Sequence, residues 1–197
     1  MILIKSTYSV VFVAAFLMVS ACSKQEQAEP APAIAAAGME APAEGPPQMT
    51  PEERAAARAA QMEKSTATEF NMAPLIDPNT ATREQLAAIA GLSEAGVQSV
   101  LDGRPFATQS ALHAAIGAGL SDADRFKVYS AMFVKVNLNT ADVADFELVP
   151  STMAAKRLAR EFEEYRPYKT MEDFSREMKK YVSEKEVAFL ERFVTIN

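Results

Sequence analysis

The feature that most constrains this chain is an internal repeat with a spacing of about 60 residues. Residues 79–81 read Asn-Thr-Ala, and residues 139–141 read the same. Residues 104–108 read Arg-Pro-Phe-Ala-Thr, and residues 166–170 answer with Arg-Pro-Tyr-Lys-Thr. Because the motifs recur in the same order, the C-terminal part of the chain is predicted to hold two copies of one structural unit.

Each copy carries the sequence signals of short helices. We call residues 72–136 repeat 1 and residues 137–197 repeat 2. Capping boxes are predicted where Gln85 follows Thr82 and where Glu186 follows Ser183. Turn residues separate successive helices, and the predicted hairpin turns contain Gly91, Leu92, Ser93, Gly119, Leu120, Ser121, Ser151, Thr152, Val182 and Ser183. The sequence therefore predicts an all-α fold of about eight short helices, paired as hairpins.

The repeated motifs resemble a known family. An Asn-Thr-Ala start, a Gly-hydrophobic-small hairpin turn and an Arg-Pro-aromatic bend are similar to the helix-hairpin-helix domain of the ComEA family of competence proteins. The resemblance covers both repeats and extends to hairpins of DNA repair proteins. It implies two tandem (helix-hairpin-helix)2 units that hold duplex DNA by its backbone and do not read its bases.

Repeat 1 departs from the family pattern at its turns. In the family, the turn glycines let backbone N–H groups approach a phosphate. Here Glu94 follows the first turn, and Asp122 and Asp124 follow the second. A carboxylate in the first helical turn repels a phosphate that approaches the same N–H groups. Gly91 and Gly119 are therefore interpreted as helix stops rather than phosphate sites.

Repeat 2 lacks the turn glycines but gathers positive charge around its turns. The candidate DNA contacts are Lys156, Arg157, Arg160, Lys179, Lys180 and Lys185. Side by side, the two turns would present one basic patch, and each phosphate contact adds affinity and salt dependence. The alternative is a solvated helix face, in which these side chains pair with neighbouring glutamates. The sequence leaves both interpretations open.

The N-terminal residues predict export and lipidation. Residues 1–21 begin with a short positive start at Lys5, continue through an apolar segment too short to span a bilayer and end in small residues, which is typical of a secretory signal. Residues 19–22 read Val-Ser-Ala-Cys and resemble the lipobox of bacterial lipoproteins, whose cysteine is acylated. Cys22 is the single cysteine of the chain. The resemblance implies a membrane lipoprotein, with Ser23 pointing to the outer membrane and the periplasm.

Residues 22–71 are predicted to form a lipidated tether. Their first half is rich in Ala, Pro and Glu and has too few large apolar residues to bury a core, so we expect it to be disordered. Thr50 with Glu53 forms a capping-box pattern, which predicts a short helix near residues 51–63.

The sequence shows no set of catalytic residues. His113 is the only histidine and falls within a predicted helix, where a structural role is expected. No metal-ligand cluster, cofactor motif or phosphate-binding glycine-rich loop is present. The net charge of −6 argues against a strongly basic nucleic-acid binder. The chain is therefore predicted to be a binding module that is not an enzyme.

Two ligands remain open at this stage. Duplex DNA is implied by the family resemblance and would be held by the basic residues of repeat 2. The alternative is a protein partner in the bacterial envelope, with the doubled domain acting as an adaptor. The domain also resembles, loosely, an extrinsic subunit of photosystem II that uses this fold without DNA, and the acidic turns of repeat 1 favour this option. Membrane attachment through the lipidated N-terminus is common to both hypotheses.

Overall fold

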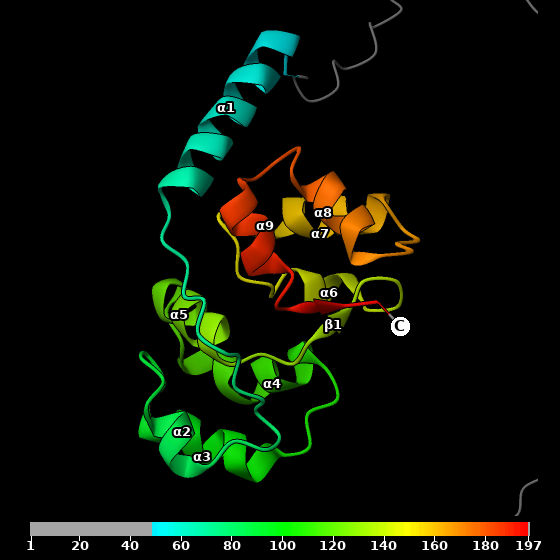
Figure 1. Ribbon diagram of the computed structural model, residues 1–197. Coiled ribbons are helices and arrows are strands. Elements are labelled where there is room, and N and C mark those ends of the chain that lie inside the picture. The colour runs from blue at the N-terminus through cyan, green and yellow to red at the C-terminus, as the bar shows by residue number, and fades with distance from the viewer. Residues whose placement is uncertain (1–48, 197) are drawn as a thin grey trace, which may run out of the picture. The chain divides into compact units, whose positions relative to one another are not determined.

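Helices make up nearly all the regular structure of residues 49–196, which a computed structural model describes (Figure 1). The predicted signal segment, Cys22 and the tether up to residue 48 lie outside the described residues. The helices are α1 (Pro51–Ala67), α2 (Arg83–Ala87), α3 (Glu94–Gly103), α4 (Gln109–Ile116), α5 (Asp122–Ala131), α6 (Val143–Phe146), α7 (Ala155–Glu164), α8 (Met171–Met178) and α9 (Glu184–Leu190), with a 3-10 turn, η1 (Gly117–Gly119), after α4. The predicted all-α fold class is confirmed. Among the described residues, no helix is both long and apolar enough to cross a membrane.

Most helices begin where the sequence provides a capping side chain, whereas α6 and α7 begin without one. The Thr82 hydroxyl accepts a hydrogen bond from the N–H of Gln85, and the Gln85 side chain in turn accepts one from the N–H of Thr82. Thr170 and Asp173 make the same reciprocal pair at the start of α8. Each pair satisfies two N–H groups that have no partner inside the helix. Local sequence alone therefore sets these helix starts.

Each repeat closes on itself through a short parallel pairing. In repeat 1, Ile76 forms an isolated bridge with Met132. At the junction of the repeats, strand β1 (Val136–Asn137) pairs in parallel with strand β2 (Val194–Thr195) at the end of repeat 2. The first and last segments of each repeat thus lie side by side. Because β1 continues directly from the end of repeat 1, the two pairings also join the repeats without a linker.

The Asn-Thr-Ala and Arg-Pro motifs, far apart in sequence, bind each other in both repeats. The Asn79 side chain donates to the carbonyl oxygen of Phe106 (3.0 Å) and accepts from its N–H (2.7 Å). Asn139 makes the same two bonds with Tyr168, at 2.9 Å and 2.8 Å. A side-chain amide can satisfy one donor and one acceptor of a backbone at once. The repeated asparagine therefore fastens the first loop of each repeat to its central loop.

The repeated arginine completes this fastening. Arg104 donates from Nε to the Pro78 carbonyl oxygen (2.5 Å) and from Nη2 to that of Ala81 (2.7 Å). Arg166 donates to the equivalent carbonyls of Leu138 (2.5 Å) and Ala141 (2.6 Å). The planar guanidinium reaches two carbonyls that no helix or strand satisfies. The arginine-proline peptide bond is cis in both repeats.

One hydrophobic core runs through both repeats. The rings of Phe133 in repeat 1 and Phe193 in repeat 2 pack edge to face with centroids 5.1 Å apart. Phe162 contacts Phe146 and Phe174 in the same geometry, at 5.2 Å and 5.3 Å. Such aromatic pairs add about 0.5–1.5 kcal/mol each beyond the area they bury. The apolar side chains of repeat 1 therefore pack directly against those of repeat 2.

The N-terminal helix is longer than the sequence predicts. The Thr50–Glu53 capping box forms as predicted, but α1 continues to Ala67 instead of ending near residue 63. Ser65 is fully buried against repeat 2, although the sequence places it in the tether beyond the predicted helix. Contacts with distant residues extend the helix, and local sequence does not contain them.

Arg166→Lys is expected to lower the free energy of unfolding by about 2 kcal/mol, because a lysine cannot reach both carbonyls and would leave one unsatisfied. Chemical denaturation measures the change. Arg83→Lys is the matched control, since Arg83 pairs with Glu94 on the surface; its effect is expected to stay within about 0.5 kcal/mol. Equal losses of stability in the two variants would refute the fastening role of Arg166.

Candidate functional site

The turns of repeat 1 present carboxylates. Gly91 adopts the left-handed conformation, with φ of 89°, as expected for a helix stop. A Cβ atom placed on Gly91 would lie 3.0 Å from Oδ1 of Asp124, so the two turns lie side by side. The Ser121 hydroxyl and, with a smaller effect, the Lys127 ammonium donate hydrogen bonds to Asp124 and lower the pKa of its carboxyl group. The charged carboxylate beside Gly91 makes this surface unfavourable for a phosphate.

In repeat 2, the buried carboxylate of Glu186 joins the two turns. Oε1 of Glu186 accepts from the Ser151 hydroxyl (2.6 Å) and from the Thr152 N–H (2.7 Å), and Oε2 accepts from the Thr152 hydroxyl (2.5 Å). Glu186 is fully buried. A negative side chain of the protein itself therefore binds an N–H group of this hairpin turn.

This arrangement differs in one detail from the sequence-based prediction. Ser183 caps α9 by accepting from the N–H of Glu186 (3.3 Å), as predicted. The predicted bond from the Ser183 N–H back to the Glu186 side chain is absent, because that carboxylate binds the other turn instead. The Ser183 N–H donates to the Ser65 hydroxyl at 2.8 Å. Only half of the predicted capping box forms, since a distant turn competes for the carboxylate.

Helix α1 covers the joined turns of repeat 2. The Gln61 amide donates to the Thr152 hydroxyl (2.8 Å), and the Lys64 ammonium donates to the Thr152 carbonyl oxygen (2.8 Å). The Ser65 and Ser183 hydroxyls lie 2.8 Å apart, and Ser183 also donates to the Ser65 carbonyl oxygen. The turns that the family resemblance assigns to DNA are thus occupied by this chain's own helix.

The predicted DNA contacts divide into two groups. Lys179 pairs with Glu184 (2.9 Å) and Lys185 with Glu69 of the segment after α1 (2.8 Å), as the solvated-face alternative predicts. The Lys180 ammonium pairs with Glu177 and lies 4.7 Å from the centre of the Tyr165 ring. Three lysines of the predicted patch therefore have carboxylate partners.

The other group lies on α7. Lys156 is exposed, and no salt bridge to it occurs among residues 49–196. Arg160 is exposed and contacts the buried Glu161 at 3.2 Å. Arg157 is half-buried, 3.9 Å from the same carboxylate, with its guanidinium 5.7 Å from the centre of the Tyr181 ring. These three side chains are what remains of the predicted basic patch.

A hollow of about 860 Å³ between α1 and α7 gathers four arginines. Arg54 and Arg58 reach it from α1, and Arg157 and Arg160 reach it from α7. The Arg58 guanidinium lies 5.6 Å from the centre of the Tyr181 ring, which Arg157 also contacts. Its further lining residues are Met49, Pro51, Ala55, Ala57, Glu161 and Glu164. We call Arg54, Arg58, Arg157 and Arg160 the arginine cluster.

The α1 half of this cluster was not predicted from the sequence. Arg54 and Arg58 stand four residues apart, which places them on one helix face. That spacing was visible in the sequence. Their meeting with α7 was not, because it depends on the docking of Ser65 onto Ser183, which are 118 residues apart.

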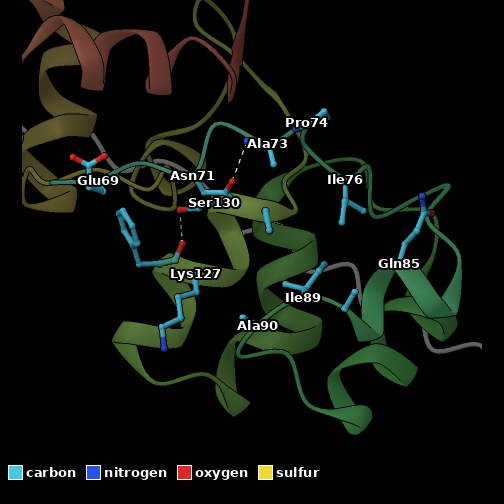
Figure 2. Close-up of a pocket in the computed structure, with 13 residues that line it drawn as sticks. Glu69, Asn71, Ala73, Pro74, Ile76, Gln85, Ile89, Ala90, Lys127 and Ser130 are labelled. Carbon is cyan, nitrogen blue, oxygen red and sulfur yellow. Dashed lines mark hydrogen bonds between the residues drawn. The ribbon is translucent and has the colours of Figure 1, made fainter.

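A second hollow lies on repeat 1 and is mostly apolar. Figure 2 shows this groove of about 480 Å³, which α2, α5 and residues 69–76 enclose. Ile76, Ile89 and Phe126 line its walls. The Ser130 hydroxyl, which also lines the groove, already donates to the Phe126 carbonyl oxygen at 2.6 Å. The groove therefore suits apolar groups and offers little to a charged ligand.

The contacts of His113 are those of a structural histidine. Its Nδ1 lies 2.6 Å from the Tyr129 hydroxyl, and the two rings meet edge to face. Burial lowers the pKa of His113 and raises that of Tyr129 to about 12, so both groups are neutral at pH 7. Among the described residues, no group of three or more His, Cys, Asp or Glu side chains is placed to hold a metal ion.

The chain matches no protein-family model, no curated protein and no solved structure. Its function is therefore inferred from its own residues and their placement.

Glu186→Ala is expected to lower the free energy of unfolding by about 3 kcal/mol, because the Thr152 N–H and two hydroxyls lose a charged acceptor. Denaturation curves of the two proteins give the difference. The control is Glu184→Ala on the exposed side of α9, for which a decrease below about 1 kcal/mol is expected. A decrease that small for Glu186→Ala would mean that its carboxylate does not join the turns.

Proposed function

We propose that this protein is a non-catalytic, membrane-anchored helix-hairpin-helix binding module that holds duplex DNA non-specifically through its phosphates. The arginine cluster carries the proposal. Four guanidinium groups from two helices line one hollow, and three of them, those of Arg54, Arg58 and Arg160, belong to exposed residues. Arginine is well suited to phosphate because its planar group donates paired hydrogen bonds.

The proposed contact surface differs from that of the family. The hairpin turns of repeat 1 carry carboxylates, and those of repeat 2 are bonded to Glu186 and covered by α1. The contact is instead assigned to side chains of α1 and α7, including Lys156 at the start of α7. Such contacts position a duplex without reading its sequence. The proposal therefore keeps the DNA ligand but moves it from the turns to the helices.

The carboxylates of the hollow limit its attraction for a phosphate. Glu161 is buried beneath Arg157 and Arg160, and Glu164 lies at the edge. Because Glu161 holds these two arginines, it neutralises part of their charge and also fixes their positions. Arg54 and Arg58 have no carboxylate within salt-bridge distance among the described residues. The α1 arginines are thus expected to contribute most of the net attraction.

Neutralising the α1 arginines tests the proposal. In the chain from residue 22 onward, Arg54→Gln with Arg58→Gln is expected to weaken binding of a labelled random-sequence duplex about tenfold or more near 0.1 M salt. The slope of log affinity against log salt is expected to fall by about 0.9 for each phosphate that the variant no longer holds. Fluorescence anisotropy across a salt series measures both quantities.

A matched control removes the same charge elsewhere. Arg83→Gln with Arg176→Gln neutralises two exposed arginines of α2 and α8 that lie outside the hollow. This variant is expected to keep the parent slope and nearly the parent affinity. Absence of duplex binding by the parent chain at low salt, or equal weakening in both variants, would refute the proposed function.

A protein adaptor is the second candidate, and the groove in Figure 2 favours it. Its walls suit one or two large apolar side chains of an envelope protein. Ala88→Arg would fill the groove from the residue that follows α2, whereas Ala87→Arg changes a neighbouring exposed residue that does not line it. The adaptor hypothesis expects one defined partner from an envelope extract to be lost with Ala88→Arg and retained with Ala87→Arg. Retention by both variants would contradict it.

A further inference from the structure

Helix α1 has two halves with different environments. Every residue from Pro51 to Ala60 is exposed. From Gln61 onward the helix is anchored, with Ser65 fully buried against Ser183. The exposed half nevertheless supplies Arg54 and Arg58 to the arginine cluster. The position of these two arginines therefore depends on anchoring residues one to three helical turns away.

The anchor itself is small and polar. It consists of the bonds from Gln61 and Lys64 to Thr152 and the exchange of bonds between Ser65 and Ser183. Beyond the helix, the rings of Phe70 and Phe189 add one aromatic contact at 4.6 Å. The core of the repeats is much larger and does not include α1. Segments held by few buried contacts open locally while the rest of a domain stays folded.

Docking of α1 gives the hollow its net positive charge. Docking brings Arg58 to one side of Tyr181 while Arg157 lies near the same ring. It also adds two positive charges to a hollow to which α7 contributes two arginines and two glutamates, Glu161 and Glu164. Like charges brought together in a partly enclosed site repel each other, and an anion between them reverses the sign of the interaction.

The geometry points to α1 as a clamp that assembles the phosphate site: docking of α1 onto the turns of repeat 2 completes the arginine cluster, and a bound polyanion in turn holds α1 docked. This inference rests on the proposed function and adds its regulation. A ligand that prefers the docked state shifts the docking equilibrium by the ratio of its two affinities. Ser65 is the positioning residue, since it acts through Arg54 and Arg58.

Hydrogen exchange of single amides tests the clamp in the unsubstituted chain from residue 22 onward. The Ser183 N–H donates to Ser65, so its exchange requires α1 to undock. A duplex at saturating concentration is expected to slow this exchange about fivefold or more, within the usual range of coupling between sites. The Tyr168 N–H, which donates to Asn139 inside repeat 2, is the control amide and is expected to keep its rate.

Two variants separate the clamp from simple binding. With Arg54→Gln and Arg58→Gln, the duplex at saturation is expected to leave Ser183 exchange unchanged, although the α7 arginines still bind it. With Cys22→Ser, Ser65→Cys and Ser183→Cys, oxidation by glutathione disulfide converts the two thiols to one disulfide and releases two glutathione thiols. The oxidised form is expected to bind duplex more tightly than the reduced form.

The outcomes distinguish the two proposals. If the parent chain binds duplex but Ser183 exchange keeps its rate, the clamp is refuted and the proposed function stands. If oxidation of the cysteine pair weakens binding, docking of α1 hides the site and the clamp is again refuted. If the parent chain binds no duplex, the proposed function and the clamp fail together.

Discussion

The fold depends on the fastening between the Asn-Thr-Ala loop and the Arg-Pro loop of each repeat. Asn139 and Arg166 together satisfy backbone groups that would otherwise be left without partners near the core. An unsatisfied buried backbone group costs about as much as several surface contacts gain. The motif that reveals the repeat in the sequence is therefore structural, and Asn79 and Arg104 serve the same purpose in repeat 1.

With both loops fastened, the hairpin turns can differ between the repeats. Repeat 1 keeps Gly91 but places Asp124 beside it. Repeat 2 replaces the glycine by Ser151 and supplies Glu186 as an internal anion. The carboxylate satisfies the turn in the way a phosphate would, so the turn no longer needs an external ligand. Helix α1 then docks on a turn whose polar groups are already paired with Glu186.

How much the sequence predicts follows from how far apart the interacting residues lie. Thr82 and Gln85 are three residues apart, and their capping box was predicted and is present. The all-α fold follows from several such local signals in succession. Glu186 binds a turn 34 residues away and Ser65 a turn 118 residues away, so neither contact leaves a local pattern. Ser65 in particular reads as a polar surface residue, and only its burial reveals the docking of α1.

Net charge and local charge act on a polyanion over different distances. The chain carries a net charge of −6, whereas the arginine cluster concentrates positive charge in one hollow. At 0.1 M salt the Debye length is about 10 Å, so a distant phosphate interacts little with the net charge of the chain or with the arginine cluster. A phosphate inside the hollow interacts mainly with the guanidinium groups. The proposed association with DNA is therefore driven by contact rather than by long-range attraction. The proposed polyanion site therefore depends on the docking of α1, which brings Arg54 and Arg58 to the arginines of α7.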